Sequence, residues 1–99
     1  MEYAKIKEIV CEDFGVTDSE IMSRSREQPV ALARHFVWYY LRKTHRLKLK
    51  EIGSMFDRNH GAIINALKNL DVWRNQDREI QEKFNRLETS FPELKGGQT

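Results

Sequence analysis

The segment Leu47–Leu70 constrains the fold more than any other, because two helical patterns follow each other there across a short polar gap. Leu49, Ile52 and Phe56 recur at the spacing of one helix face. Residues 57–59 interrupt this pattern, and a second one then comprises Ile63, Ile64, Leu67 and Leu70. Two helices joined by a few polar residues form either a helix-turn-helix or an ordinary helical hairpin in a small bundle.

Polar or small residues lead the second of these helices, namely Asn59, His60, Gly61, Ala62 and then Asn65. In a helix-turn-helix, the N-terminal end of the second helix meets base edges in the DNA major groove. Such an end therefore favours a DNA-reading helix. Two roles stay open for Asn59, because asparagine is a good helix N-cap and also pairs bidentately with adenine.

Basic residues are concentrated just before this segment, although the net charge of the whole chain is only +2. Residues 24–50 contain a single acid, Glu27, and the basic residues Arg24, Arg26, Arg34, Arg42, Lys43, Arg46, Lys48 and Lys50. A one-sided basic cluster beside a helix-turn-helix is the charge distribution expected of a phosphate-binding surface. The alternative is a solvated basic helix face that binds nothing.

The sequence from Leu49 to Ile63 resembles the signature of the C-terminal DNA-binding domain of the bacterial replication initiator DnaA. The shared features are Leu49-Lys50-Glu51-Ile52-Gly53, then Phe56, then Arg58-Asn59-His60 and Ile63. The likeness runs from Ile6 to about Phe91 and includes an arginine-bearing loop before a long helix that begins near Pro29. It implies an all-α domain of about five to six helices with a helix-turn-helix, similar also to the Trp repressor fold.

The resemblance implies a role for several side chains. Arg58 would contact a guanine edge or an adjoining phosphate, and His60 a base or phosphate. Arg26 matches the arginine that the family places in the minor groove, with Arg24 as second choice, and this fits the attraction of arginine to a narrow minor groove. Arg34 and His35 stand where the family has residues near the DNA backbone. Cations before and along the reading helix would contact phosphates, and these include Lys48, Lys50 and Lys68.

Two departures from the family pattern bear on specificity. Asp57 alone precedes Arg58, where the family turn usually has two glycines, so this turn is one residue shorter. Gly61 and Ala62 replace two threonines, whose methyl and hydroxyl groups can read bases. We therefore expect the binding mode to persist while the target site differs. Asn65 and Lys68 either carry part of the readout or only touch phosphates.

The rest of the chain reads as scaffold. Apolar spacing predicts helices over residues 4–14 and 29–43, and a capping box at residues 17–20 predicts a short helix between them. Residues 71–77 are expected to let the chain bend before a last helix that ends ahead of Pro92. We expect one domain over residues 1–92 and a disordered tail over residues 93–99.

Several function classes find no support in the sequence. Cys11 is the only cysteine, so no disulfide framework or cysteine metal site forms within one chain. No G-x-x-x-x-G-K-[ST] motif is present, so we expect no ATPase, nucleotide or cofactor, and no catalytic spacing of serine and histidine is recognisable. No apolar run is long enough to cross a membrane, and no signal peptide begins the chain, so the expected compartment is the cytoplasm, at the nucleoid.

The sequence thus supports two functions. The first is sequence-specific binding of double-stranded DNA by a stand-alone domain, for replication initiation or transcription regulation. The second is a protein-interaction module that keeps the fold but holds a partner protein through Phe36, Trp38 or Trp73. The two differ in salt dependence, because phosphate binding weakens steeply with salt and apolar docking does not. The target sequence and the oligomeric state stay open.

Overall fold

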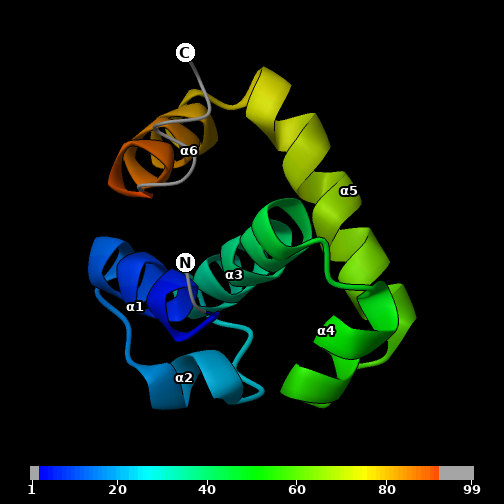
Figure 1. Cartoon of the computed structure of the whole chain (residues 1–99). Helices are drawn as coiled ribbons and strands as arrows, with labels where there is room; N and C mark the ends of the chain where they lie inside the picture. Colours follow the sequence, from blue (N-terminus) through cyan, green and yellow to red (C-terminus); the bar gives the residue numbers. More distant parts are fainter. Residues whose placement is uncertain (1–2, 92–99) are drawn as a thin grey trace.

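The computed structural model describes residues 3–91, and within this range the chain forms six α-helices and no strand (Figure 1). They are α1 (Tyr3–Phe14), α2 (Asp18–Met22), α3 (Val30–His45), α4 (Leu49–Phe56), α5 (His60–Gln76) and α6 (Arg78–Ser90). The predicted all-α class is confirmed. The tail predicted over residues 93–99 lies outside the described residues.

Local signals in the sequence set the first helix boundaries. Gly15 ends α1 in a left-handed conformation, with φ at +67°. Thr17 opens α2 with the predicted capping box: the Glu20 amide donates to Thr17 Oγ1 at 3.1 Å, and the Thr17 amide donates to Glu20 Oε1 at 2.9 Å. Two unsatisfied amides are thereby paired, which explains how a helix of five residues persists.

The bend expected over residues 71–77 is confined to the last residue of that segment, because α5 continues as a helix to Gln76. The segment contains no glycine or proline, and Arg74 is held from outside: it donates to Glu88 of α6 and to the Tyr39 hydroxyl of α3, each at 3.2 Å. The chain turns only at Asp77, whose Oδ1 accepts from the Ile80 amide at 3.3 Å and caps α6.

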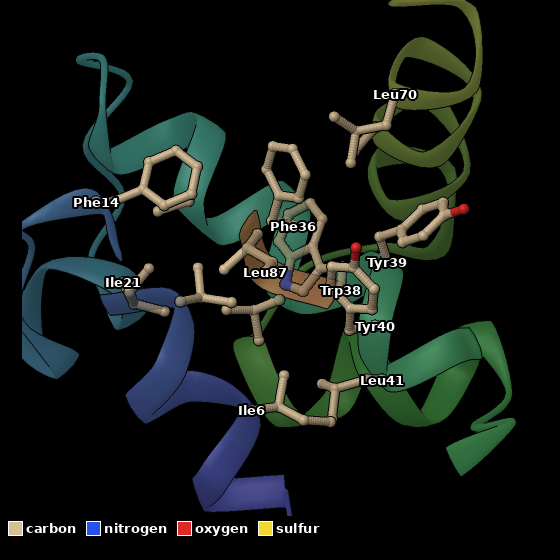
Figure 2. Packing of buried hydrophobic residues seen from close by; sticks show 14 of the residues in the cluster. Ile6, Phe14, Ile21, Phe36, Trp38, Tyr39, Tyr40, Leu41, Leu70 and Leu87 are labelled. Carbon is tan, nitrogen blue, oxygen red and sulfur yellow. The ribbon is translucent and has the colours of Figure 1, made fainter. Parts of the chain in front are cut away.

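Helix α3 is the centre of the fold, and α1, α2, α4 and α5 all pack against it (Figure 1). The side chains predicted to face the core are all buried, namely Val30, Ala33, Val37, Tyr40 and Leu41. Phe84 of α6 lies against Phe36, with ring centroids 4.7 Å apart, and Phe91 lies 4.6 Å from Tyr40. Figure 2 shows part of the core, in which aromatic side chains of α3 such as Phe36 and Tyr40 lie among side chains of the other helices.

Burial of the α3 aromatics corrects one part of the protein-interaction alternative. Phe36 is 0% exposed and Trp38 only 3% exposed, so neither can hold a partner protein. A helix apolar on more than one face is expected in the centre of a bundle, and here every residue of α3 except Arg42 and Lys43 is buried or half-buried. Trp73, near the C-terminal end of α5, is the aromatic of the three that reaches the surface, at 37% exposed.

Candidate nucleic-acid interface

The connection between α4 and α5 is a tight turn of three residues, 57–59. Asp57 has a left-handed backbone, with φ at +52°, and the Arg58 amide donates to the Gly53 carbonyl at 2.9 Å. Aspartate tolerates this conformation better than most residues with a Cβ, so it takes the place of a glycine. The turn therefore closes although it is one residue shorter than the family pattern.

Asn59 is the N-cap of α5, which is one of the two roles left open by the sequence. Its Oδ1 accepts a hydrogen bond from the Ala62 amide at 2.9 Å. That oxygen satisfies one of the amides that the first turn of a helix leaves unpaired. His60, Gly61 and Ala62 follow at the N-terminal end of α5, and all three are exposed.

Further along, α5 has one buried and one exposed face. Ile63, Ala66 and Leu70 are buried in the core. Gly61, Asn65 and Lys68 are exposed, and their i, i+4, i+7 spacing puts them on a single face. A Cβ added to Gly61 would meet only the Asn59 side chain, at 3.3 Å. The fold therefore leaves room at this end of the helix for another surface to approach.

The loop of residues 23–29 lies beside the α4–α5 turn, although more than 30 positions separate them in the chain. Arg24 Nη2 donates to Asp57 Oδ2 at 2.9 Å and to the Asp57 carbonyl at 3.2 Å. Arg58 Nη2 donates to the Ser23 carbonyl at 2.8 Å. These bonds, together called the loop–turn bridge, bring Arg26 and the start of α5 to the same side of the molecule.

A groove of ≈ 920 Å³ separates the loop from α5, with α3 as its floor. It is lined by Arg24, Ser25, Arg26, Ala31, Arg34, His35, Trp38, Asp57, Arg58, Asn59 and Ala62. Four of these are arginines and only one is an acid, so the groove is strongly positive. Lys50 and His60 line a smaller hollow on the other side of the turn. Lys48 is exposed one residue before α4.

Arg34 does not have the role near the DNA backbone that the resemblance implies. It is only 4% exposed, and its guanidinium donates to the carbonyls of Ile21 at 2.7 Å, Ser25 at 2.9 Å and Glu20 at 3.1 Å. Burial, and then the nearby positive charge of Arg58, lower its pKa below the usual value. Arg34 instead fixes the end of α2 and the loop to α3.

Two buried ring nitrogens lie at the floor of the groove. His35 Nδ1 and Trp38 Nε1 have no hydrogen-bond partner within residues 3–91. Burial, and then the charge of Arg34, lower the pKa of His35 from 6.5 to about 4, so the ring is neutral at pH 7. The apolar spacing of α3 could have indicated that His35 is largely enclosed, since Trp38 and Tyr39, three and four positions further on, are both apolar and buried.

The described residues offer no other chemistry of note. Within residues 3–91, no group of three or more His, Cys, Asp or Glu side chains could hold a metal ion. None of the described helices is long and apolar enough to cross a membrane.

Comparison with known proteins gives a consistent result. The family model of the bacterial DnaA protein helix-turn-helix matches residues 3–70. The chromosomal replication initiator protein DnaA of Pseudothermotoga lettingae is 33% identical over 84 residues, which cover 84% of this chain and 19% of that protein. The DnaA proteins of Oleidesulfovibrio alaskensis and Onion yellows phytoplasma are 29% and 30% identical, over 80% and 81% of this chain.

The matched segment includes α1 to α4 in full, the loop of residues 23–29, and α5 as far as Leu70. The chain spans less than a fifth of the length of these relatives, with shares of 19%, 18% and 16%. The family model covers well over half of this chain, and the helix-turn-helix that its description names is present. The chain therefore belongs to the bacterial DnaA helix-turn-helix family.

Proposed function

We propose that this domain binds double-stranded DNA in a sequence-dependent manner, with the N-terminal end of α5 in the major groove. The observation that carries the proposal is the shared placement of Arg26 and the start of α5 around one positive groove. Small exposed residues at positions 61 and 62 let the helix backbone approach base edges closely. His60 and Asn65 are the exposed side chains with donors and acceptors for those edges.

Arg26 is the proposed minor-groove contact. It is exposed, and within residues 3–91 no hydrogen bond or ion pair holds its guanidinium. Arg24 is bonded to Asp57, so it is the less available of the two loop arginines. A recognition helix in the major groove with an arginine in the adjoining minor groove is a geometry that DNA-binding domains use.

The proposed phosphate contacts come from three cations around this face. All three are exposed: Lys48 lies just before α4, Lys50 on α4 and Lys68 on α5. The N-terminal ends of both helices add amide groups and a partial positive charge, which favour phosphate. Such contacts give affinity and register, whereas specificity comes from the base edges.

The proposed biological role is DNA recognition in replication initiation, because the relatives are named chromosomal replication initiators. A role in transcription regulation would use the same surface. The domain would act by binding and not by catalysis. Any nucleotide-dependent step would belong to other parts of the relatives, of which this chain matches less than a fifth.

Selection of bound duplexes from a random pool tests the proposal, followed by titration of a selected duplex over a salt series. We expect a defined motif, and an affinity that falls linearly on a log–log plot against salt. A pool that stays random after selection would exclude sequence-dependent binding. An affinity that does not respond to salt would exclude phosphate contacts.

A second candidate is the docking of a partner protein at the other end of α5. It is favoured by the exposure of two consecutive apolar side chains, Val72 at 51% and Trp73 at 37%. They lie about two turns beyond Asn65 and one turn beyond Lys68, at the far end of the exposed face of α5. The two functions are compatible, and Trp73→Ala would separate them by leaving DNA affinity unchanged.

A further inference from the structure

We infer that Arg58 is a positioning residue and not a base reader: it holds the loop of residues 23–29 in place relative to α5. In this way Arg26 and the reading helix engage one duplex together. The inference rests on the proposed function and assigns a different role to Arg58 from the guanine or phosphate contact that the resemblance implies.

Both terminal nitrogens of the Arg58 guanidinium already donate to carbonyl oxygens within the protein. Its Nη1 donates to the Phe56 carbonyl at 3.0 Å, in the turn, and its Nη2 donates to the Ser23 carbonyl at 2.8 Å, in the loop. The side chain is half-buried. A bidentate guanine contact needs two outward-facing donors on the guanidinium, and two of its terminal donors here point at carbonyl oxygens.

The position of the loop relative to α5 depends on such a contact, because its other bonds tie it to α2 and α3 and not to the α4–α5 turn. Residues 24–29 form no regular structure, and most of them are exposed. The amides of Ser25 and Glu27 bond serine hydroxyls at 3.2 Å and not a helix or strand. Arg34 holds the loop to α3. Within the described residues, the hydrogen bonds between the loop and the turn come only from Arg24, which donates to Asp57, and from Arg58, which donates to the Ser23 carbonyl.

Of these two arginines, Arg58 makes the stronger part of the loop–turn bridge. The Arg24–Asp57 ion pair is exposed at both ends, with side chains 70% and 95% accessible, so solvent and salt weaken it. The Arg58–Ser23 bond is partly buried and involves a charged donor, which makes it more favourable than a neutral surface hydrogen bond. Loss of Arg58 should therefore release the loop while the buried Arg34 contacts keep the fold.

A double-mutant cycle distinguishes positioning from base reading. Affinity for a selected duplex would be measured for the wild type, Arg58→Ala, Arg26→Ala and the double variant. Under the inference, Arg58 acts through Arg26, so Arg58→Ala weakens binding by about tenfold in the wild type and less than about twofold in the Arg26→Ala background. Effects that simply multiply would overturn the inference.

Selection from a random pool gives the second readout. Arg58→Ala should lose the preference at the minor-groove flank and keep the motif read by α5. Loss of one position inside that motif would instead identify Arg58 as a base reader. Arg78→Ala is the matched control, because it removes an exposed arginine from the start of α6, away from the groove.

Amide hydrogen exchange tests the bridge without any DNA. In Arg58→Ala, the amides of Ser25 and Glu27 should exchange at least several-fold faster, while those of α3 stay protected. Arg58→Lys should recover part of this protection, since lysine can still donate to the Ser23 carbonyl. Unchanged loop exchange would overturn the inference even if DNA binding is intact, and absence of DNA binding by the wild type would instead reject the proposed function.

Discussion

Gly53 and Arg58 are in contact through their backbones, and a Cβ added to Gly53 would lie 2.6 Å from the Arg58 carbonyl oxygen. Real Cβ atoms do not approach a carbonyl so closely, and neither atom lies on a flexible side chain. The helix α4 and the turn before α5 can therefore meet only if residue 53 is glycine. This contact fixes where α5 begins.

Replacement of Gly53 by alanine should lower the free energy of unfolding by about 1–3 kcal/mol, because the turn must move to make room. Urea denaturation measures the loss. Gly61→Ala is the control: its Cβ meets only a side chain, at 3.3 Å, and alanine favours helix, so we expect a change within about 1 kcal/mol. Equal effects at the two glycines would contradict the backbone contact.

Arg34→Ala should destabilise the domain by about 2–4 kcal/mol, because it leaves three carbonyl oxygens without their donor and opens space in the core. Thermal unfolding followed by circular dichroism measures this. Arg26→Ala removes the same charge from an exposed position, and its stability should change by less than about 0.5 kcal/mol. If Arg34→Ala lowers stability only slightly but weakens DNA binding strongly, Arg34 contacts DNA after all.

Stability should fall as the pH is lowered from about 6.5 towards 4, because of His35. Its pKa is lowered to about 4 in the folded protein, against 6.5 in the unfolded chain, so in this window the unfolded chain binds more protons. The contribution is fully present above 6.5 and is lost as the pH falls to the folded value; it is on the order of 3 kcal/mol. His35→Gln should flatten the curve of unfolding free energy against pH in this window. An unchanged slope would show that His35 is not enclosed.

Asn59→Ala should cost about 1 kcal/mol of stability, because the Ala62 amide loses its cap. Asn59→Asp keeps an oxygen at the same place and adds a negative charge at a helix N-terminus, so its unfolding free energy should equal or exceed that of the wild type. Chemical denaturation of the three proteins in parallel compares them. A destabilised aspartate variant would be inconsistent with capping.

Lys48→Ala should weaken binding to all duplexes by a similar factor and reduce the slope of log affinity against log salt by about one. Fluorescence anisotropy with a selected and an unrelated duplex measures both quantities. Glu82→Ala, a charge change on the exposed side of α6, is the control and should leave the slope unchanged. A Lys48 effect confined to the selected duplex would indicate a base contact.

Much of the fold follows from local patterns. The spacing of Val30, Ala33 and Val37 predicts the buried face of α3, and the residue types at Thr17 and Glu20 predict the start of α2, as observed. These features depend on neighbours within a turn or two, which a sequence displays directly.

The expectations that differ from the structure depend on distant residues. The segment 71–77 is polar except for Val72 and Trp73 and looks suited to a bend, yet it stays helical to Gln76 because Arg74 contacts α3 and α6. In the sequence, Arg34 looks like the exposed arginines of the same basic cluster, such as Arg26 and Arg42. No residue near it in the chain shows that three carbonyls from α2 and the loop accept its hydrogen bonds. Its i+3 and i−4 neighbours on α3 are Val37 and Val30, both buried, which is the available signal.

The enclosure of Arg34 changes how the chain's basicity should be interpreted. Eight cations fall between positions 24 and 50, but one lies inside the protein and another faces Asp57, so a duplex would meet fewer of them than the sequence suggests. Each cation that stays away from the phosphates leaves the condensed ions of the duplex undisturbed. The number of ions released on association should therefore report how many of these cations contact phosphates, and how many instead hold the fold together.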